Sequence, residues 1–318
     1  MPQTGRVRTS GLVLVVAATV MAAAWLPAHA QPLVERADDG LVVGLTVPWA
    51  IGGDRIEADG RLHRFPGEWP TVPFESIRLW DTRTAWLNLE PRNDQWDFSR
   101  LDLFVAKSRA RGVSDISLVL GGTPRWAARQ QRPTDAAWMG PGSASPPKRM
   151  SDWSDFVATV AARYRGVITS YEVWNEPNDV TFWSGTRAEW VRMVQAAATA
   201  IRAADPAAVV VASGFAMGSL RDVARVAPWV DALAGVRPAV DAVSIHWYPR
   251  TGDDLTAIAP VLRAMERRAR TAGIAGQPWI TEVNVRGGAE LSAARQRDAV
   301  RALTDSARAS GAARMTWY

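Results

Sequence analysis

Residues 168–178 read I-T-S-Y-E-V-W-N-E-P-N, a β-type run that ends in Asn-Glu-Pro. Pro177 has no backbone N–H for a sheet ladder, so a strand over Ile168–Trp174 is predicted to end before it. Several other runs are continuous stretches of Val, Ile and Leu, which is typical of parallel strands buried on both faces. The further runs are Leu41–Thr46, Ser76–Trp80, Asp115–Leu120, Ala208–Ala212, Val240–Trp247, Trp279–Val283 and Arg314–Trp317.

Helical patterns separate these eight runs. Apolar residues at helical spacing form one stripe from Trp153 to Tyr164 and another from Trp190 to Ile201. Thr186 and Glu189 make a capping box before the second stripe. Further helices are predicted over Ser99–Arg111, Ser219–Leu233, Leu255–Ala272 and Leu291–Ser310. Strands that alternate with helices form parallel βαβ units, so the pattern predicts an α/β fold, a (β/α)8 TIM barrel. A doubly wound open sheet is the alternative.

Three segments depart from this pattern. Pro48–Phe74 has turn signals but no clear helix. Gly121–Met150, after the third strand, is rich in Pro, Gly and Ser, and loops of this length are usually functional. It lies at the end of the barrel where active sites are found. The chain stops at Tyr318 without an eighth helix, and we expect it to be truncated after strand eight.

The N-terminus has the features of an export signal. Arg6 and Arg8 precede the apolar run Gly11–Leu26, and Ala28-His29-Ala30 matches the small-x-small cleavage pattern. This predicts a secreted, periplasmic or cell-envelope protein, with an uncleaved anchor as the alternative. No later stretch is apolar and long enough to span a bilayer. The chain is divided into a signal peptide (1–30), a linker (31–40) and a barrel domain (41–318).

The composition excludes several classes of partner and of functional site. The 37 basic and 32 acidic residues give a net charge of +5, and the arginines are scattered, so no nucleic-acid partner is predicted. Without cysteine there is no disulfide or thiol chemistry. No His or Cys cluster with metal-ligand spacing, phosphate loop or serine nucleophile motif is present, so we expect neither a metal nor a cofactor. The 16 tryptophans suit either sugar stacking or an aromatic-rich core.

Two glutamates end predicted strands, Glu176 in the fourth and Glu282, within W-I-T-E-V-N, in the seventh. In a barrel these strands lie across from one another, so the two side chains meet at the mouth. Cleavage of a glycosidic bond requires two such carboxyl groups, one to protonate the leaving oxygen and one to attack or to activate water. The pair therefore indicates a glycoside hydrolase.

This arrangement resembles the clan A retaining glycosidases, and most of all the family 39-like proteins, which include β-xylosidases, α-iduronidases and exopolysaccharide endoglycosidases. I-R-L-W-D at 77–81, G-T-P-R-W at 122–126 and T-W-Y at 316–318 extend the resemblance over nearly the whole barrel domain. The resemblance implies that Glu176 is the general acid/base, that Glu282 is the nucleophile, and that the substrate is a poly- or oligosaccharide. A family 5-type β-glycanase, a transglycosylase with the same pair, and a catalytically silent carbohydrate-binding barrel remain open.

The resemblance also implies substrate-binding and supporting residues. Asn175 corresponds to the residue that binds the sugar 2-hydroxyl, and Arg78 to the arginine that keeps the nucleophile ionised. Arg78 would alternatively, or also, pair with Glu172, which points into the barrel. His246 and Tyr248 end the sixth strand. Tyr248 would donate to Glu282, and His246 would lie close to both glutamates, with a satisfied core histidine as the alternative.

Tryptophans complete the predicted site. Trp317 corresponds to an aromatic floor, and Trp126 is a candidate platform. Trp138 and Trp183, in the loops after strands three and four, are the better candidates for sugar subsites among the other tryptophans. The sugar, the linkage and the oligomeric state do not follow from the sequence.

Overall fold

The chain, analysed as a computed structural model, is described over residues 40–56, 62–132, 138–287 and 291–318. The predicted signal peptide and residues 31–39 of the predicted linker lie outside the described residues. Among those that are described, no helix combines the length and the apolarity needed to cross a bilayer.

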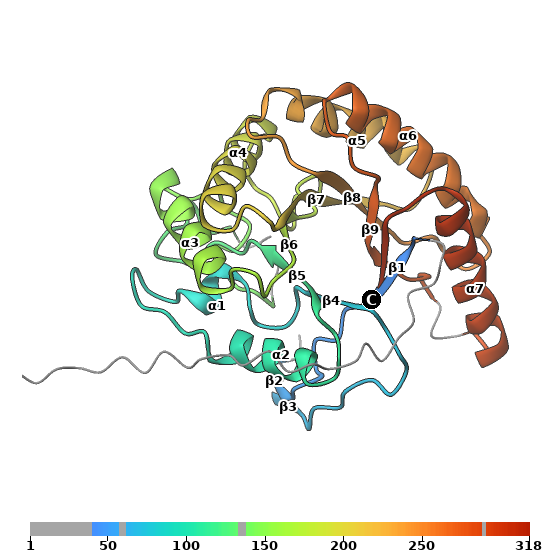
Figure 1. Cartoon of the computed structure of the whole chain (residues 1–318), viewed down its shortest axis with the longest axis horizontal. Helices are drawn as coiled ribbons and strands as arrows, with labels where there is room; N and C mark the ends of the chain where they lie inside the picture. Colours follow the sequence, from blue (N-terminus) through green and yellow to red (C-terminus); the bar gives the residue numbers. More distant parts are fainter. Residues whose placement is uncertain (1–39, 57–61, 133–137, 288–290) are drawn as a thin grey trace, which may run out of the picture. The chain divides into compact units, whose positions relative to one another are not determined.

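Eight parallel strands form a closed barrel in the order β1-β10-β9-β8-β7-β6-β5-β4, and β1 pairs with β4 to close it (Figure 1). The strands are β1 (Val42–Leu45), β4 (Ser76–Leu79), β5 (Asp115–Leu120), β6 (Ser170–Asn175), β7 (Val209–Met217), β8 (Ala242–Trp247), β9 (Trp279–Val283) and β10 (Arg314–Trp317). The predicted (β/α)8 barrel is confirmed, and the open-sheet alternative is excluded because β1 pairs with both β10 and β4, which leaves none of the eight strands at an edge.

Helices cover the outside of the barrel in Figure 1. They are α1 (Trp86–Leu89), α2 (Ser99–Arg109), α3 (Met150–Arg163), α4 (Arg187–Ala204), α5 (Asp222–Asp231), η1 (Ala232–Gly235), η2 (Leu255–Ala257), α6 (Ile258–Thr271) and α7 (Ala293–Ala309). The predicted capping box is present, since the Thr186 side chain accepts from the Glu189 N–H and the Glu189 carboxylate accepts from the Thr186 N–H. The main apolar core lies between the strands and these helices.

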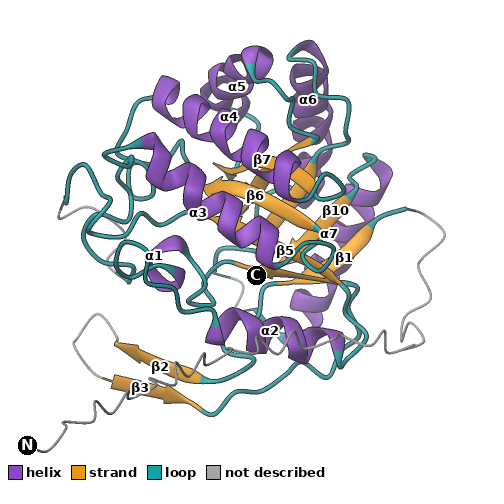
Figure 2. Cartoon of the chain, turned by 60° about the vertical axis from the view of Figure 1, so that its left-hand side comes forward, coloured by secondary structure: helices purple, strands orange, loops and turns teal. Residues whose placement is uncertain are grey.

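Two elements differ from the sequence prediction. Pro48–Phe74 contains an antiparallel hairpin of β2 (Gly53–Ile56) and β3 (Leu62–Phe65), which lies beside α2 in Figure 2. Its sequence lacks the apolar alternation that identifies a half-buried strand. The strand predicted over Ala208–Ala212 runs on to Met217 as β7, because Gly214 continues the pairing with β6 and β8.

The inside of the barrel is polar along much of its length. Ser244 of β8 and Thr281 of β9 both donate to Glu172 of β6, so these side chains meet across the barrel interior. A small apolar cluster separate from the main core contains Val211 and Trp279. Bulky aliphatic layers usually fill such a barrel. In this barrel, buried polar side chains lie beneath the residues at the mouth.

Candidate active site

The end of β6 has an unusual backbone that places its side chains. Trp174 has φ 72° and Glu176 has φ 43°, in the left-handed region that non-glycine residues rarely adopt. Each such residue costs about 1–3 kcal/mol and is held only by its surroundings. Trp174 is held by its ring packing on Trp153 of α3 and by a hydrogen bond from its indole N–H to the Phe182 carbonyl.

This backbone conformation interrupts the regular inward and outward alternation of side chains along β6. Regular alternation from Glu172 would turn Trp174 into the barrel, but Trp174 packs outward, and Asn175 turns inward instead. The Glu176 N–H then donates to the Gly214 carbonyl of β7, which ties the strand end to its neighbour. The strain at β6 therefore brings Glu172, Asn175 and Glu176 to one side of the sheet.

Arg78 of β4 joins the buried polar groups. Its Nε donates to Glu172 Oε2 at 2.7 Å, its Nη1 to Glu282 Oε1 at 2.6 Å, and its Nη2 to Asn175 Oδ1 at 3.1 Å. Burial alone lowers the pKa of Arg78, but the charges of Glu172 and Glu282 outweigh it and leave that pKa raised. Arg78 thus pairs with Glu172 and contacts Glu282 at the same time.

Glu282 ends β9 in a dense set of donors. Besides Arg78, the Tyr248 hydroxyl donates to Glu282 Oε2 at 2.7 Å, and His246 Nδ1 lies 3.4 Å from the same oxygen. Burial alone raises the pKa of Glu282, but His246, Arg78 and the hydrogen bonds together bring that pKa below its ordinary value. Glu282 is therefore held as a carboxylate, with both oxygens in use.

Glu176 is less enclosed than Glu282. His246 Nδ1 lies 2.7 Å from Glu176 Oε1, in the one side-chain hydrogen bond that Glu176 makes among the described residues. Burial lowers the pKa of His246, but the nearby carboxylates Glu282 and Glu176 raise it by more. An oxygen of Glu176, an oxygen of Glu282 and a ring nitrogen of His246 all lie within 4.8 Å of one another.

A carboxylate–histidine–carboxylate cluster could in principle hold a metal ion. Both oxygens of Glu282 already accept hydrogen bonds, and the Arg78 guanidinium lies 2.6 Å from one of them. A divalent cation placed there would be repelled by the guanidinium. The arrangement suits a neutral substrate between two carboxyl groups better than a bound cation.

Beneath these groups lies a second layer of residues. Glu172 is fully buried, and its Oε1 accepts from Ser244 and Thr281, each at 3.0 Å. Gly214 lies against it: a Cβ there would be 1.9 Å from His246 Nε2 and 2.8 Å from Glu172 Oε1. Only glycine leaves room for His246. Sequence reasoning missed Gly214, although a glycine inside a predicted strand often marks such a close approach.

The predicted aromatic residues separate into different places. Trp126 donates its indole N–H to the Glu90 carbonyl and packs on Trp86. Neither of these contacts involves the carboxylate pair. Trp183 is buried against Trp174, so it is a packing residue and not an open subsite. Trp317 is half-buried at the end of β10, in register with Val283 next to Glu282.

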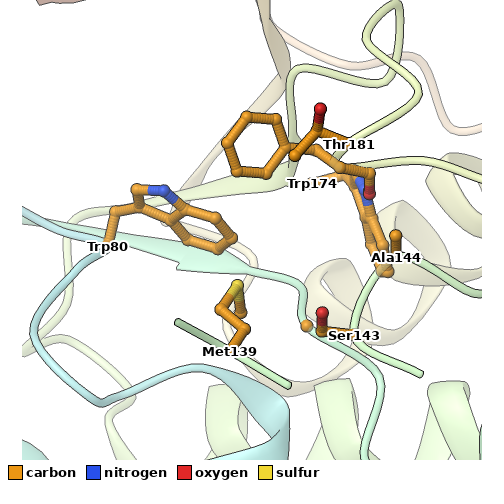
Figure 3. Close-up of a pocket in the computed structure, with 8 residues that line it drawn as sticks. Trp80, Met139, Ser143, Ala144, Trp174 and Thr181 are labelled. Atoms are coloured by element: carbon orange, nitrogen blue, oxygen red, sulfur yellow. The ribbon is translucent and has the colours of Figure 1, made fainter. Parts of the chain in front are cut away.

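The long segment after β5 is folded onto the strand ends. Thr123 Oγ1 donates to the Ser145 carbonyl at 2.6 Å, and Ala128 and Pro147 form an antiparallel bridge. Figure 3 shows Met139 and Ser143 of this segment facing Trp80 and Trp174 around a narrow pocket. The predicted loop thus borders the mouth of the barrel.

The chain matches known glycosidases. The model of the family Cellulase (glycosyl hydrolase family 5) matches residues 118–318. A β-xylosidase from Geobacillus stearothermophilus is 30% identical over 115 residues, which are 34% of this chain and 22% of that protein.

Solved structures share the fold. A glucosidase from Croceicoccus marinus superposes with a TM-score of 0.62 at 15% identity, over 87% of this chain and 59% of that one. A family 39 β-xylosidase from Caulobacter crescentus gives a TM-score of 0.58 at 22% identity, over 77% and 55%. The chain thus spans little more than half the length of these structures. The predicted resemblance to clan A glycosidases is confirmed, and family 39 enzymes are among the structures that share the fold. The chain belongs to the cellulase family, glycosyl hydrolase family 5.

Proposed function

We propose that the protein is an exported glycoside hydrolase that cleaves a poly- or oligosaccharide with net retention, with Glu282 as nucleophile and Glu176 as general acid and base. One observation carries the proposal: oxygens of two glutamates lie within 4.8 Å of each other at the barrel mouth, in unlike surroundings. Retaining enzymes keep their carboxyl groups about 5–5.5 Å apart, against about 6.5–9.5 Å in inverting ones.

The first step forms a glycosyl-enzyme. The ionised Glu282 attacks the anomeric carbon, while the proton on Glu176 passes to the departing glycosidic oxygen. Arg78 and Tyr248 keep Glu282 ionised and fix its orientation before the attack. Glu176, bonded only to His246 among the described side chains, retains an oxygen for the substrate.

The second step releases the sugar. Water attacks the anomeric carbon from the face that the leaving group vacated, and Glu176 takes the proton of that water. The bond between Glu282 and the sugar breaks, and both carboxyl groups return to their starting states. Two inversions at one carbon give net retention.

Other residues hold the sugar in this proposal. Asn175 is fixed by Arg78 through its Oδ1, which leaves its Nδ2 to donate to the sugar 2-hydroxyl. Trp317 lies beside the end of β9 and offers an aromatic floor. Trp126 is left out of the proposed site, because its indole N–H and its ring are both used in packing.

The names of the similar proteins guide the choice of substrates. They include a β-xylosidase, a glucosidase and an exo-β-1,4-mannosidase. We therefore propose β-linked xylose, glucose or mannose chains as first substrates. Export is proposed from residues 1–30 and is tested by comparing the cellular location of the full chain with that of a chain lacking them.

The test is proton NMR of the first-formed anomer during hydrolysis of aryl β-xylosides, β-glucosides and β-mannosides. We expect the β-anomer first, followed by slow mutarotation. Initial release of the α-anomer would show inversion and contradict the proposal. Glu176→Gln, which removes the proton donor at nearly constant size, is the matched variant, and full activity of that variant on an unactivated glycoside would also contradict it.

A further inference from the structure

Trp138 differs from the other tryptophans of the described chain. It alone among them has an exposed side chain, with half of its surface open to solvent. Its ring meets the ring of Trp80 edge-on, with centroids 5.8 Å apart at 87°. Trp80 is itself only 5% exposed. A buried indole thus supports an open one, which fixes the position of the open ring at the barrel mouth.

Trp80 lies at a strand end that contributes to the proposed site. It follows Arg78 by two residues at the end of β4, and Arg78 contacts Glu282. The ring of Trp80 also contacts the ring of Phe182, with centroids 6.4 Å apart. Phe182 belongs to the turn that starts at Glu176, since the Asp179 N–H donates to the Glu176 carbonyl and the Phe182 N–H to the Asp179 carbonyl. The aromatic group is therefore continuous with the end of β4, which carries Arg78, and with the turn that follows Glu176.

Met139, next to Trp138, anchors this part of the loop. Figure 3 shows its side chain pointing toward Trp80 at the edge of the narrow pocket. A Cβ on Gly122 would lie 2.3 Å from the Met139 methyl group, so glycine at this position leaves the space that Met139 fills. This pocket is too narrow to hold a sugar ring, whereas the ring of Trp138, which packs on Trp80 of the pocket wall, is half exposed.

We propose that Trp138 is a sugar-stacking platform, which binds a ring of the substrate chain beyond the residue bonded to Glu282. The proposal rests on the proposed function and adds a second point of contact with the oligo- or polysaccharide named there. A pyranose presents an apolar face of C–H groups and a rim of hydroxyls. A rigid indole face buries the first and leaves the second hydrated. Trp138 offers such a face without the ordering cost of a flexible side chain.

The test compares Trp138→Ala with the parent on two kinds of probe. One is an aryl glycoside of a single sugar; the other is the β-1,4-linked series from disaccharide to hexasaccharide of the same sugar. We expect an unchanged rate on the aryl glycoside. On the oligosaccharides that are long enough to reach Trp138, KM should rise about two- to tenfold, with little change in kcat. Trp138→Phe should restore most of the loss.

Leu103→Ala is the matched control, because Leu103 is 43% exposed on α2, outside the barrel mouth. It should change neither probe. Equal losses on the aryl glycoside and the hexasaccharide, or no loss on either, would overturn the platform. If the parent turns over neither probe, the proposed function fails, and calorimetric binding of the hexasaccharide then tests the platform alone. Weaker binding by Trp138→Ala than by Leu103→Ala supports it, and equal binding overturns it.

Discussion

The carboxyl ends of β9 and β6 present the same chemical group in opposite surroundings. At β9, Glu282 is 6% exposed, accepts hydrogen bonds from Arg78 and Tyr248, and has a pKa below its ordinary value. At β6, Glu176 is half-buried, has a left-handed backbone, and bonds to His246 alone among the described side chains. One glutamate has both oxygens in hydrogen bonds, and the other has a single described hydrogen bond at one oxygen.

The proposed roles of the two glutamates therefore rest on their neighbours and not on the residue type. Arg78 on β4 and Tyr248 after β8 converge on Glu282, and no described cation other than His246 lies within ion-pair distance of Glu176. A nucleophile must be ionised before the reaction, whereas an acid/base must change state twice in each cycle. Substitutions at one glutamate, or at the neighbours of one glutamate, therefore test the proposed roles separately.

The largest effect is expected for Glu282→Ala. Without the nucleophile, the rate should fall by at least about 10⁴-fold on every substrate, because the covalent step is lost. Azide can then attack the open face, and a single displacement gives a glycosyl azide of inverted configuration. NMR of that product is the measurement. An azide product of retained configuration would exchange the proposed roles.

Glu176→Ala should be more selective. Loss of general acid catalysis costs about 10²–10⁴-fold where the leaving group needs a proton. Glycosides with acidic phenols as leaving groups still form the glycosyl-enzyme, so their loss in the first step should be small. Azide should rescue this variant with retained configuration, since Glu282 still attacks first. Rates measured across a series of phenol leaving groups test this, and a uniform loss would contradict it.

Glu172→Gln changes the layer beneath both glutamates. Breaking a buried ion pair costs about 3–5 kcal/mol of stability, and Gln keeps the shape while removing the charge that pairs with Arg78. Thermal or urea unfolding measures this loss. Arg78 should then act more strongly on Glu282, so the acid limb of kcat/KM should move to lower pH. An unmoved limb in a folded variant would show that Glu172 only supports packing.

Tyr248→Phe should shift the same limb in the other direction. It removes one of the hydrogen bonds that lower the pKa of Glu282, so that pKa should rise. The activity needs ionised Glu282, is present above this pKa, and is lost as pH falls through it. The acid limb should therefore move to higher pH, with about a tenfold lower kcat/KM on the plateau. A pH–rate profile beside that of Glu172→Gln checks both signs.

Much of the fold and of the candidate site could be predicted because both depend on strand ends. The Val, Ile and Leu runs located the barrel strands, and the meeting of Glu176, Glu282, Arg78, His246 and Tyr248 follows from where those strands end. The hairpin β2–β3 was missed because its sequence has no apolar alternation.

Side-chain direction was harder to predict. A period of two cannot show that the left-handed Trp174 turns outward and Asn175 inward. Nor can it show that Gly214 is needed to make room for His246, since that contact lies between strands. For the same reason the sequence could not separate packing tryptophans from exposed ones. Trp183 and Trp126 use their rings in packing, and only contacts in space distinguish them from the exposed Trp138.

The contrast between Glu282 and Glu176 is tested most directly by trapping the glycosyl-enzyme. A 2-deoxy-2-fluoro glycoside with a good leaving group slows release of the intermediate, and peptide mass spectrometry then locates the sugar. We expect a single adduct on Glu282, formed also by Glu176→Ala and absent from Glu282→Ala. An adduct on Glu176, or hydrolysis of the parent glycoside with inversion and no adduct, would contradict it.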